Sequence, residues 1–477
     1  MHKWKRLSVT MSAIVAFTAI SFNIPGANVS AATDYKFDFG GGGVQSGYIG
    51  VSASTAYSKS LGYGFNTPAN MKNVTASGTG VASDAVQFLT YGTKSTNTFN
   101  VDLSNGLYEV KVTLGNTSRA SVAAEGVFQI INMTGNNAVD KFQIPITDGQ
   151  LNLLVTEGKE GTAFTLSALE IKKLSDNPAT NKTIYIGGDS TVCNYYPLDT
   201  SEQAGWGQML PKYVSTDHFQ IRNMASGGQI ARGFRDDGQF EAIMKYLKPG
   251  DYFIIQLGIN DTNEKNNTTE AQFKEIMRDM VVKAKATGAT VVLSTPQGRA
   301  TDFNTSNVHT AVNRWYRSAT MALAKEENVR LLDLNVLSSA YFTSIGPDAT
   351  LALYMSGDTL HPNRAGATQL ARIVYENLKL TIGSPTPTFT STKAPTNTPT
   401  NTPTQTKAPS NTPTPTAKTL VEDINGDRVV NMADVIMLAR NFNAQVTDSI
   451  RNCDLNGDGV INMSDVIKIA LKFNTSI

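Results

Sequence analysis

The chain has 477 residues, of which 40% are hydrophobic, and a formal net charge of +1. This length exceeds what one hydrophobic core normally organises, so two or three domains are expected. Because the charge is nearly balanced and no Lys/Arg stripe is present, a nucleic-acid partner is not expected.

The first 31 residues have the pattern of a secretory signal peptide. Lys3, Lys5 and Arg6 precede an apolar segment that ends near Ile20, and small residues follow up to Ala31. No later segment offers the roughly 20 uninterrupted apolar residues that a membrane-spanning helix needs. We therefore expect a secreted, extracellular protein with no membrane partner.

Only two cysteines are present, Cys193 and Cys453, and they lie far apart in the sequence. A disulfide framework is therefore not expected to stabilise this chain. Both cysteines are expected to be free and to pack as small hydrophobic residues.

Residues 33–176 predict a β-sandwich. The region is rich in Gly, Ser, Thr, Val and Asn, and its apolar residues fall in short alternating runs separated by turn residues. The clearest runs are 99–103, 107–112 and 142–146.

Residues 181–383 predict a doubly wound α/β domain with a parallel sheet, because short apolar runs alternate with segments of helical periodicity. The expected buried strands are 183–186, 253–257, 290–293 and 329–332, and the expected helices are 270–287, 306–327 and 364–380. Gly288 is well placed to end the first helix. Ligands of such a domain bind at the carboxyl ends of the strands.

Residues 384–418 are a tract of Thr, Pro, Asn, Ser and Lys with almost no apolar residues. This composition cannot form a core, and dense prolines favour extended conformations. The tract is predicted to be a semi-rigid spacer that precedes a small unit at residues 419–477.

A serine and a histidine in characteristic settings predict acyl transfer to water. Ser190 ends the string Gly-Gly-Asp-Ser directly after the run 183–186, and His361 ends the string Asp-Thr-Leu-His that begins at Asp358. A serine on a sharp turn after a strand exposes its hydroxyl, while the histidine accepts the proton and the aspartate orients the imidazole. An Asp-x-x-His string alone more often marks a structural histidine, and its pairing with the serine turn favours catalysis.

The other histidines are poorer candidates for the base. His2 lies in the signal peptide, His309 in the expected helix 306–327, and His218 in a short polar stretch before a strand. Neither His218 nor His309 has an acid at a productive spacing.

The developing negative charge also needs hydrogen-bond donors. Asn260 follows the strand 253–257 and offers a side-chain amide, while Gly228 follows another strand-like run and offers a backbone N–H. The N–H of Ser190 is the third candidate. A plain turn at 227–228 and an Asx-turn at Asn260 are the alternatives.

The final unit contains an internal repeat of Asp and Asn residues. They occupy loop positions one, three, five, nine and twelve and recur 31 positions later. Oxygen ligands in this pattern suit calcium, so two Ca²⁺ sites are expected, with two solvated Asn/Asp turns as the alternative. The expected ligands are Asp423, Asn425, Asp427, Asn431 and Asp434, then Asp454, Asn456, Asp458, Asn462 and Asp465.

This repeat resembles the type I dockerin family, small helical calcium-binding domains that join an enzyme to a cohesin on a scaffolding protein. Two features depart from an EF-hand loop: Arg428 replaces the glycine found at Gly459 in the second copy, and aspartate rather than glutamate ends each loop. Loop positions ten and eleven help to choose the cohesin in that family. Here they are Met-Ala at 432–433 and Met-Ser at 463–464, and they leave the cohesin type open.

In the order GDS, glycine turn, GxND and DxxH, the four blocks of the α/β region closely resemble the SGNH hydrolase superfamily. No G-x-S-x-G string occurs, which excludes an α/β-hydrolase nucleophile elbow. The resemblance implies a flavodoxin-like sheet, Ser190 as nucleophile with His361 and Asp358, and an oxyanion hole completed by Gly228 and Asn260.

Further strings look like rhamnogalacturonan acetylesterases, which remove acetyl groups from the pectin backbone. They are Gly-Trp-Gly at 205–207, Ala-Arg-Gly-Phe at 231–234 and Asp-Thr-Leu-His-Pro-Asn at 358–363. This likeness implies an acetylated plant polysaccharide as substrate and no cofactor for catalysis. Acetylxylan or lipolytic esterases of the same superfamily would share every catalytic residue, and a noncatalytic carbohydrate-binding subunit is the alternative from another class.

The N-terminal region resembles the galactose-binding-like modules that often accompany these esterases, with Phe-Asp-Phe-Gly at 37–40 and Ala-Leu-Glu-Ile at 168–171. Sugar binding by this module and mere shaping of the esterase cleft both stay open. Near the serine loop, Tyr195, Tyr196 and Trp206 could stack on sugar rings or pack in the core.

Overall fold

The computed structural model describes residues 34–90, 97–156 and 164–381, and in the C-terminal part residues 421–425, 430, 434–435, 437–438, 441, 444, 446–447, 450–462, 465, 468–469 and 472. The expected signal peptide and linker lie outside the described residues. The chain divides into two compact units, Met1–Thr386 and Pro387–Ile477. Within the described segments, no helix has the length and apolar character needed to cross a bilayer.

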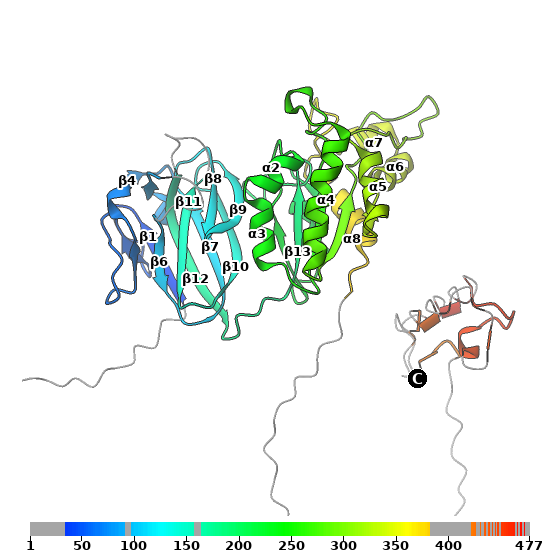
Figure 1. The fold of residues 1–477 in the computed structure, drawn as a ribbon, viewed down its shortest axis with the longest axis horizontal. Helices are drawn as coiled ribbons and strands as arrows, with labels where there is room; N and C mark the ends of the chain where they lie inside the picture. The colour runs from blue at the N-terminus through cyan, green and yellow to red at the C-terminus, as the bar shows by residue number, and fades with distance from the viewer. Residues whose placement is uncertain are drawn as a thin grey trace, which may run out of the picture. The chain divides into compact units, whose positions relative to one another are not determined.

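The first half of the larger unit is a β-sandwich (Figure 1). One sheet has the order β10-β7-β12-β1-β2, with β5 paired to β12 and β4 paired to β5, and the other has the order β3-β6-β11-β8-β9. The strands are β1 Asp34–Phe39, β2 Ile49–Val51, β3 Tyr63–Phe65, β4 Met71–Thr75, β5 Asp84–Phe88, β6 Phe99–Asp102, β7 Gly106–Leu114, β8 Arg119–Ala124, β9 Val127–Thr134, β10 Val139–Ile146, β11 Gln150–Thr156 and β12 Phe164–Ser175. Strands β6, β7 and β10 confirm the three runs identified in the sequence.

Aromatic side chains fill the space between the two sheets of the sandwich. Phe37, Phe39 and Phe99 are fully buried, and the Phe99 ring meets the other two edge to face at 5.1 and 4.9 Å. Edge-to-face contact is a favoured arrangement of aromatic rings. Inward-facing residues of β1 and β6 therefore join the two sheets.

The second half of the larger unit is an α/β domain with a five-stranded parallel sheet in the order β14-β13-β15-β16-β17. The strands are β13 Lys182–Gly188, β14 Phe219–Asn223, β15 Tyr252–Gln256, β16 Thr290–Ser294 and β17 Arg330–Leu332. The helices are α1 Trp206–Met209, α2 Ala231–Asp236, α3 Gln239–Tyr246, α4 Glu270–Ala286, α5 Arg317–Glu326, α6 Leu334–Ile345, α7 Pro347–Leu351 and α8 Arg364–Leu378. This strand order is the flavodoxin-like one, and the order reverses between β13 and β15.

Helices cover both faces of this sheet, as the alternation along β15 shows. Phe253 and Ile255 pack in the cluster that contains α2, α3, α4 and α5, whereas Tyr252 and Ile254 pack in the cluster that contains α1, α6 and α8. Successive residues of a strand point to opposite faces, so a strand buried on both sides is apolar throughout. The doubly wound α/β architecture is confirmed.

The expected helix 306–327 is wrong in its first half. Only Arg317–Glu326 is helical. The side chain of Asn304 accepts from the N–H groups of Ser306 and Val308 at 2.9 and 3.0 Å, and such local bonds compete with helix formation. The expected strand 329–332 is also only partly buried, because β17 is an edge strand.

The helix expected at 270–287 is α4, and Gly288 follows it with φ of +82°. Its N–H donates to the Lys285 carbonyl at 2.9 Å. A left-handed glycine at this position is a common helix terminus, so the prediction for Gly288 is confirmed.

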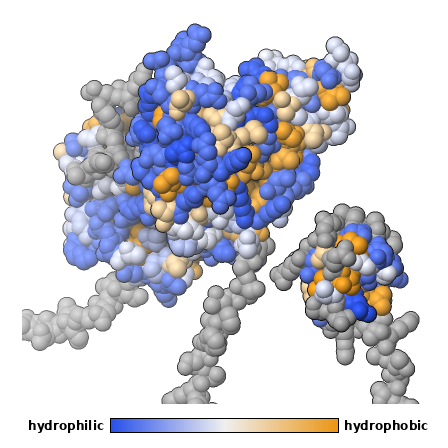
Figure 2. All heavy atoms as spheres, turned by 45° about the vertical axis from the view of Figure 1, so that its right-hand side comes forward, coloured by the Kyte–Doolittle hydropathy of each residue, from blue (hydrophilic) through white to orange (hydrophobic). Residues whose placement is uncertain are grey.

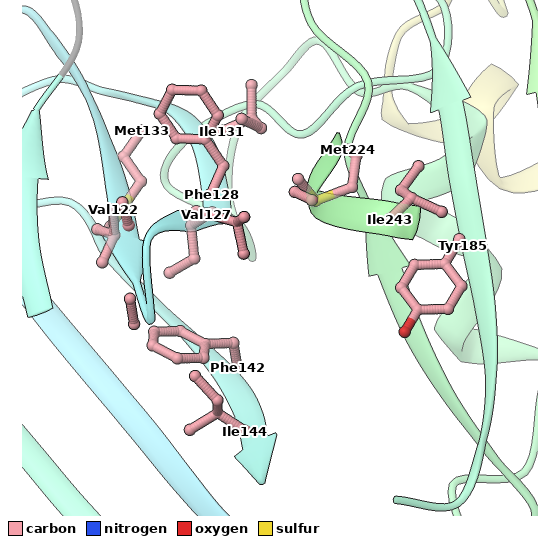
Figure 3. Close-up of a cluster of buried hydrophobic side chains, with 14 of the residues drawn as sticks. Val122, Val127, Phe128, Ile131, Met133, Phe142, Ile144, Tyr185, Met224 and Ile243 are labelled. Carbon is pink, nitrogen blue, oxygen red and sulfur yellow. The ribbon is translucent and has the colours of Figure 1, made fainter. Parts of the chain in front are cut away.

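The sandwich and the α/β domain share one hydrophobic cluster. Phe128 and Ile131 of β9 face Met224 and Ile243 of the α/β domain across the join (Figure 3). Arg222 of β14 is 7% exposed, and its guanidinium donates to the Phe128 carbonyl at 3.2 Å and to the Gln129 side chain at 2.8 Å. Figure 1 shows α3 next to β9, so the two domains meet along β9, α3 and the edge strand β14.

The surface of the larger unit is mostly hydrophilic, with hydrophobic residues grouped in a band on the face shown in Figure 2. The smaller unit has its own core, formed by Ile424, Val430, Leu438, Cys453, Ile461 and Ile469. Cys453 lies in the short 3₁₀ helix Arg451–Cys453. Cys193 and Cys453 are both free and buried, as expected.

Candidate active site

Ser190, His361 and Asp358 form a continuous chain of hydrogen bonds. The Ser190 Oγ lies 2.9 Å from His361 Nε2, and His361 Nδ1 lies 2.7 Å from Asp358 Oδ2. When the Nδ1 proton faces the carboxylate, Nε2 can accept the serine proton. The three side chains are partly exposed, so a substrate can reach them.

Backbone donors keep Asp358 ionised. Its Oδ1 accepts from the N–H of Leu360 at 2.7 Å and from the N–H of His361 at 3.1 Å. Burial alone would raise the pKa of Asp358, but these bonds and the adjacent imidazole outweigh burial and lower that pKa. The carboxylate is therefore charged where it would stabilise an imidazolium.

Asp189 holds the turn that carries Ser190. It is fully buried, and its Oδ1 accepts from the N–H of Thr191 at 2.9 Å and from the Thr191 hydroxyl at 2.8 Å. Burial raises the pKa of Asp189 to about 6, although the bonds from Thr191 oppose this effect. Asp189 therefore serves the local fold of the turn and does not touch the base.

The two glycines before Asp189 are required by close packing. A Cβ at Gly187 would lie 2.5 Å from the Phe234 ring, and a Cβ at Gly188 would lie 2.6 Å from the Val192 side chain. Both distances are shorter than real Cβ contacts allow. The end of β13 can therefore approach α2 and the serine turn only with glycine at these positions.

Asn363 fixes the loop that carries His361. Its side-chain oxygen accepts from Gly366 N–H at 3.0 Å and caps α8, while its amide donates to the carbonyls of Ala352 and Tyr354 at 2.8 and 3.1 Å. A capped helix start with both side-chain groups bonded gives the preceding residues a defined position. The base is thus placed by a helix N-terminus and not by a free loop.

The three candidate oxyanion donors end three neighbouring strands. Ser190 follows β13, the turn with Gly228 follows β14, and Asn260 follows β15. Among the residues that the structure describes, the N–H groups of Ser190 and Gly228 have no hydrogen-bond acceptor. Gly228 has φ of +75°, and nothing lies within 4 Å of the place a Cβ would take, so backbone conformation favours glycine there.

The amide of Asn260 is oriented by the same turn. Its Nδ2 donates one hydrogen to the Gln229 carbonyl at 3.1 Å, and the second hydrogen of the NH₂ group remains for another acceptor. Asp261 accepts from the N–H groups of Ala231 and Gly258 at 2.9 and 3.2 Å, which ties the Asn260 loop to α2. Burial raises the pKa of Asp261 to about 6.

The aromatic residues near the serine loop have structural partners. Trp206 is fully buried and donates from its indole to the Gln256 side chain at 3.1 Å, so it packs in the core and cannot stack on a sugar. The Tyr195 hydroxyl donates to the Ser190 carbonyl at 2.7 Å, and the Tyr196 hydroxyl donates to Asp140 of the sandwich at 2.6 Å. Both tyrosines therefore brace the nucleophile loop.

His309 lies in a loop and not in a helix, which corrects the expectation for this residue. It is 4% exposed, and its two ring nitrogens lie 2.9 Å from Ser339 Oγ and 2.8 Å from the Arg299 carbonyl. Burial, as the largest cause, lowers the pKa of His309. His309 is a satisfied structural histidine, and His218 directly precedes β14.

Arg299 lies beside the triad although no sequence pattern marks it. Its guanidinium is 5.5 Å from the centre of the Trp315 ring and 3.4 Å from the Thr359 hydroxyl, in the loop between Asp358 and His361. Within the described residues, no carboxylate forms an ion pair with Arg299. Sequence reasoning missed it because only the packing of two distant loops brings it to the site.

The two loops of the C-terminal unit close in the same way in each repeat. Asp434 Oδ1 accepts from the N–H groups of residues 424 and 425 at 2.7 and 3.2 Å, and Asp465 Oδ1 accepts from those of residues 455 and 456 at 2.8 and 3.1 Å. Asp454 accepts from Gly457, Asp458 and Gly459 N–H groups. The aspartate at position twelve therefore holds the start of each loop.

These loops offer oxygen ligands, which is the donor chemistry that calcium prefers. Asp427 and Asn431 of the first loop lie outside the described residues, as do Arg428 and the pairs at 432–433 and 463–464. Within the residues described, no group of three or more His, Cys, Asp or Glu side chains lies close enough together to hold a metal ion. The individual ligands therefore stay a prediction.

Comparison with family models matches three parts of the chain. Residues 35–172 match the galactose-binding domain-like model of β-agarase/YXIM esterase-like proteins, residues 187–369 match the GDSL-like lipase/acylhydrolase family, and residues 421–473 match the dockerin type I domain. The fold, the site and these matches thus define a GDSL-like hydrolase that a galactose-binding-like domain precedes and a dockerin follows in the sequence.

The chain belongs to the GDSL/SGNH esterase family. It is 69% identical to the uncharacterized esterase YxiM of Bacillus subtilis over 381 residues. The aligned region covers 80% of this chain and 98% of YxiM. A crystal structure of the B. subtilis YxiM protein matches 72% of this chain and 98% of its own, at 73% identity and a TM-score of 0.72. The probable rhamnogalacturonan acetylesterase YesY of the same species is 33% identical over 206 residues, 41% of this chain and 92% of its own.

The alternative of a noncatalytic subunit is set aside, because the relatives in this family are esterases and acetylesterases. Dockerin type I domains bind calcium and cohesins, which suggests an extracellular, cellulosome-associated protein.

Proposed function

We propose that this protein is a secreted serine esterase that removes acetyl groups from rhamnogalacturonan, the acidic backbone polymer of pectin, and that its dockerin docks it to the cohesin of a scaffolding protein. The B. subtilis relative YesY is named a probable rhamnogalacturonan acetylesterase, and RhgT, which is 30% identical over 210 residues, is named a rhamnogalacturonan acetylesterase. The hydrogen-bond chain from Ser190 Oγ through the His361 ring to Asp358 is the observation that supports the chemistry most.

In the proposed mechanism, His361 Nε2 takes the Ser190 proton while the serine oxygen attacks the acetyl carbonyl. The N–H groups of Ser190 and Gly228 and the free hydrogen of the Asn260 amide stabilise the oxyanion. The bond from the acetyl carbon to the sugar oxygen then breaks, and the imidazolium protonates that oxygen, so that the sugar leaves with a free hydroxyl. Water repeats the sequence on the acetyl-enzyme, releases acetate and restores the serine.

The position of Arg299 supports an acidic polymer over a neutral one. Gly258 has φ of +121°, and a Cβ there would lie 2.2 Å from the Trp315 carbonyl, so Trp315 packs directly on the loop that leads to Asn260. The partly exposed Arg299 guanidinium lies over Trp315 and beside Thr359. A cation between the Asn260 and His361 loops suits the carboxylate of a galacturonate unit, which a xylan backbone or a lipid chain lacks.

The same proposal assigns two Ca²⁺ ions to the dockerin, with the ten Asp and Asn residues of the two loops as ligands. The matching backbone bonds to Asp434 and Asp465 support two equivalent loops. Calcium would supply much of the folding free energy of a unit with so small a core.

A panel assay tests the substrate. Acetate release is measured from acetylated rhamnogalacturonan, acetylated xylan and an aryl acetate, with Ser190→Ala as the inactive control. We expect rhamnogalacturonan to be the best substrate. Arg299→Gln should raise KM for this polymer about tenfold, the value of one charge-assisted contact of roughly 1.4 kcal/mol, and leave the aryl acetate unaffected. Faster turnover of xylan by the wild type would contradict the assignment.

A further inference from the structure

The turn that offers the Gly228 N–H is held from outside its own domain. Ser226, two residues before Gly228, is 4% exposed, and its Oγ accepts a hydrogen bond from the side-chain amide of Asn132 in β9 of the sandwich. The two residues come from different domains, and their contact lies within the buried join described above.

Asn132 is placed for this contact by an irregularity in the sandwich. The pairing of β8 with β9 shifts by one residue between Ala120/Met133 and Val122/Ile130, and Asn132 lies in the extra residue pair with φ of +52°. Its backbone N–H donates to Ser121 Oγ at 3.0 Å. Bulges of this kind redirect a side chain, and here the redirected side chain faces the α/β domain.

Ser226 connects the contact to the reacting groups on both sides. Its N–H donates to the Gly188 carbonyl, two residues before the nucleophile, at 3.1 Å. Its carbonyl accepts from Gln229 N–H at 3.2 Å, and the Gln229 carbonyl in turn accepts from the Asn260 amide at 3.1 Å. One buried residue thus sets the distance between the nucleophile turn and two of the three oxyanion donors.

The apolar part of the join restrains the same segment. Met224, which begins the segment, points toward Ile131 and Phe128 of the sandwich (Figure 3). Gly227 and Gly228 are exposed and have no neighbours within 4 Å of a Cβ position, so nothing on their outer side holds the turn. Its position therefore depends on the residues that flank it, and the sandwich contacts those that precede it.

We infer that Asn132 of the sandwich is a positioning residue for the oxyanion hole, so that the galactose-binding-like domain contributes to the catalytic rate of the esterase. The inference rests on the proposed function of Ser190, Gly228 and Asn260. It gives the sandwich a role in the reaction itself, independent of any sugar that it binds.

Two variants break the contact from opposite sides. Asn132→Gly removes the amide without straining a left-handed residue, and Ser226→Ala removes the acceptor. Loss of an oxyanion donor typically costs about 10²- to 10³-fold in kcat, and we expect a displaced donor to cost about tenfold. KM for an aryl acetate should stay within about twofold, because the contact does not touch the substrate.

The double variant distinguishes this mechanism from general weakening of the join. Because both changes remove one contact, Asn132→Gly/Ser226→Ala should be no slower than either single variant. Lys245→Ala is the matched control: it breaks another hydrogen bond across the join, from the Lys245 ammonium to the Glu125 carbonyl, away from the turn. This control should keep the wild-type kcat.

A kcat of either single variant within twofold of the wild type, or additive losses in the double variant, would overturn the inference. Hydrogen exchange of the segment 224–230 provides a readout that does not need activity. Exchange should rise in Asn132→Gly and not in Lys245→Ala, and unchanged exchange also contradicts the inference. A wild type without esterase activity would instead refute the proposed function.

Discussion

The esterase domain shares its hydrophobic interior with the sandwich, whereas the dockerin has an interior of its own. Buried polar contacts from Arg222 and Asn132 also cross the join between the sandwich and the esterase domain. The dockerin forms a compact unit of its own with a separate core, and the backbone hydrogen bonds to Asp434 and Asp465 close loops within that unit. Under our proposals, the sandwich affects the rate at which the ester is cleaved, whereas the dockerin determines where the enzyme is located.

The largest effect should come from removing the nucleophile. Ser190→Ala is expected to lower acetate release by at least about 10⁴-fold, as in other serine triads. Because Ser190 belongs to neither the sandwich nor the dockerin core, the thermal midpoint and binding to a cohesin should match those of the wild type. Retained turnover in this variant would contradict the assignment of Ser190 as the nucleophile.

Asp358→Asn should rank second. We expect kcat to fall by about 10²- to 10⁴-fold, since an amide no longer holds the Nδ1 proton of His361 or stabilises the imidazolium. Because the pKa of Asp358 is lowered, the wild-type carboxylate stays charged well into acid, and protonation of Asp358 should not limit kcat/KM above pH of about 5. A pH–rate profile of both proteins measures this, and an unchanged kcat in the variant would contradict the role of Asp358.

Removal of calcium should affect the dockerin and leave the esterase domain unchanged. With EDTA, the dockerin should lose its fold and its cohesin binding, because metal binding supplies its folding free energy. The rate of aryl acetate hydrolysis should not change. Circular dichroism, pull-down with a cohesin and a parallel activity assay test this. A loss of esterase activity in EDTA would contradict the independence of the esterase domain from the dockerin.

A smaller effect, on the free energy of unfolding, is expected at the contact between Asp140 of the sandwich and Tyr196 of the α/β domain. Burial raises the pKa of Asp140 to about 6, so the folded protein holds this proton more tightly than the unfolded chain does. The associated stability is present below the ordinary pKa near 4 and is lost as the pH rises through about 6. Asp140→Asn should therefore gain up to about 3 kcal/mol over the wild type between pH 4 and 7 in denaturant unfolding. A constant difference across this range would show that Asp140 is ionised throughout.

Much of the site could be predicted from the sequence because each chemical group follows a strand of one parallel sheet. Ser190, the Gly228 turn and Asn260 end adjacent strands, so short local strings define groups that the fold brings together. The β-sandwich was predictable for the same local reason, from alternating runs and turn residues.

The remaining features depend on contacts between segments far apart in the chain. The first half of the helix 306–327 is absent because the Asn304 side chain binds the local backbone, which a periodicity count does not include. Arg299 and Asn132 lie outside every motif, and only a shared interior brings them near the reacting groups.

The edge strand β14 has a practical consequence for anyone who shortens this protein. Arg222 of this strand, together with Met224, Tyr185 and Ile243, is buried where the esterase domain meets the sandwich. An esterase domain expressed from residue 181 onward would expose an unpaired edge strand and a hydrophobic patch to other copies of itself. Such a fragment is expected to aggregate in solution. A protein that ends at residue 383 keeps the sandwich and therefore keeps this surface buried.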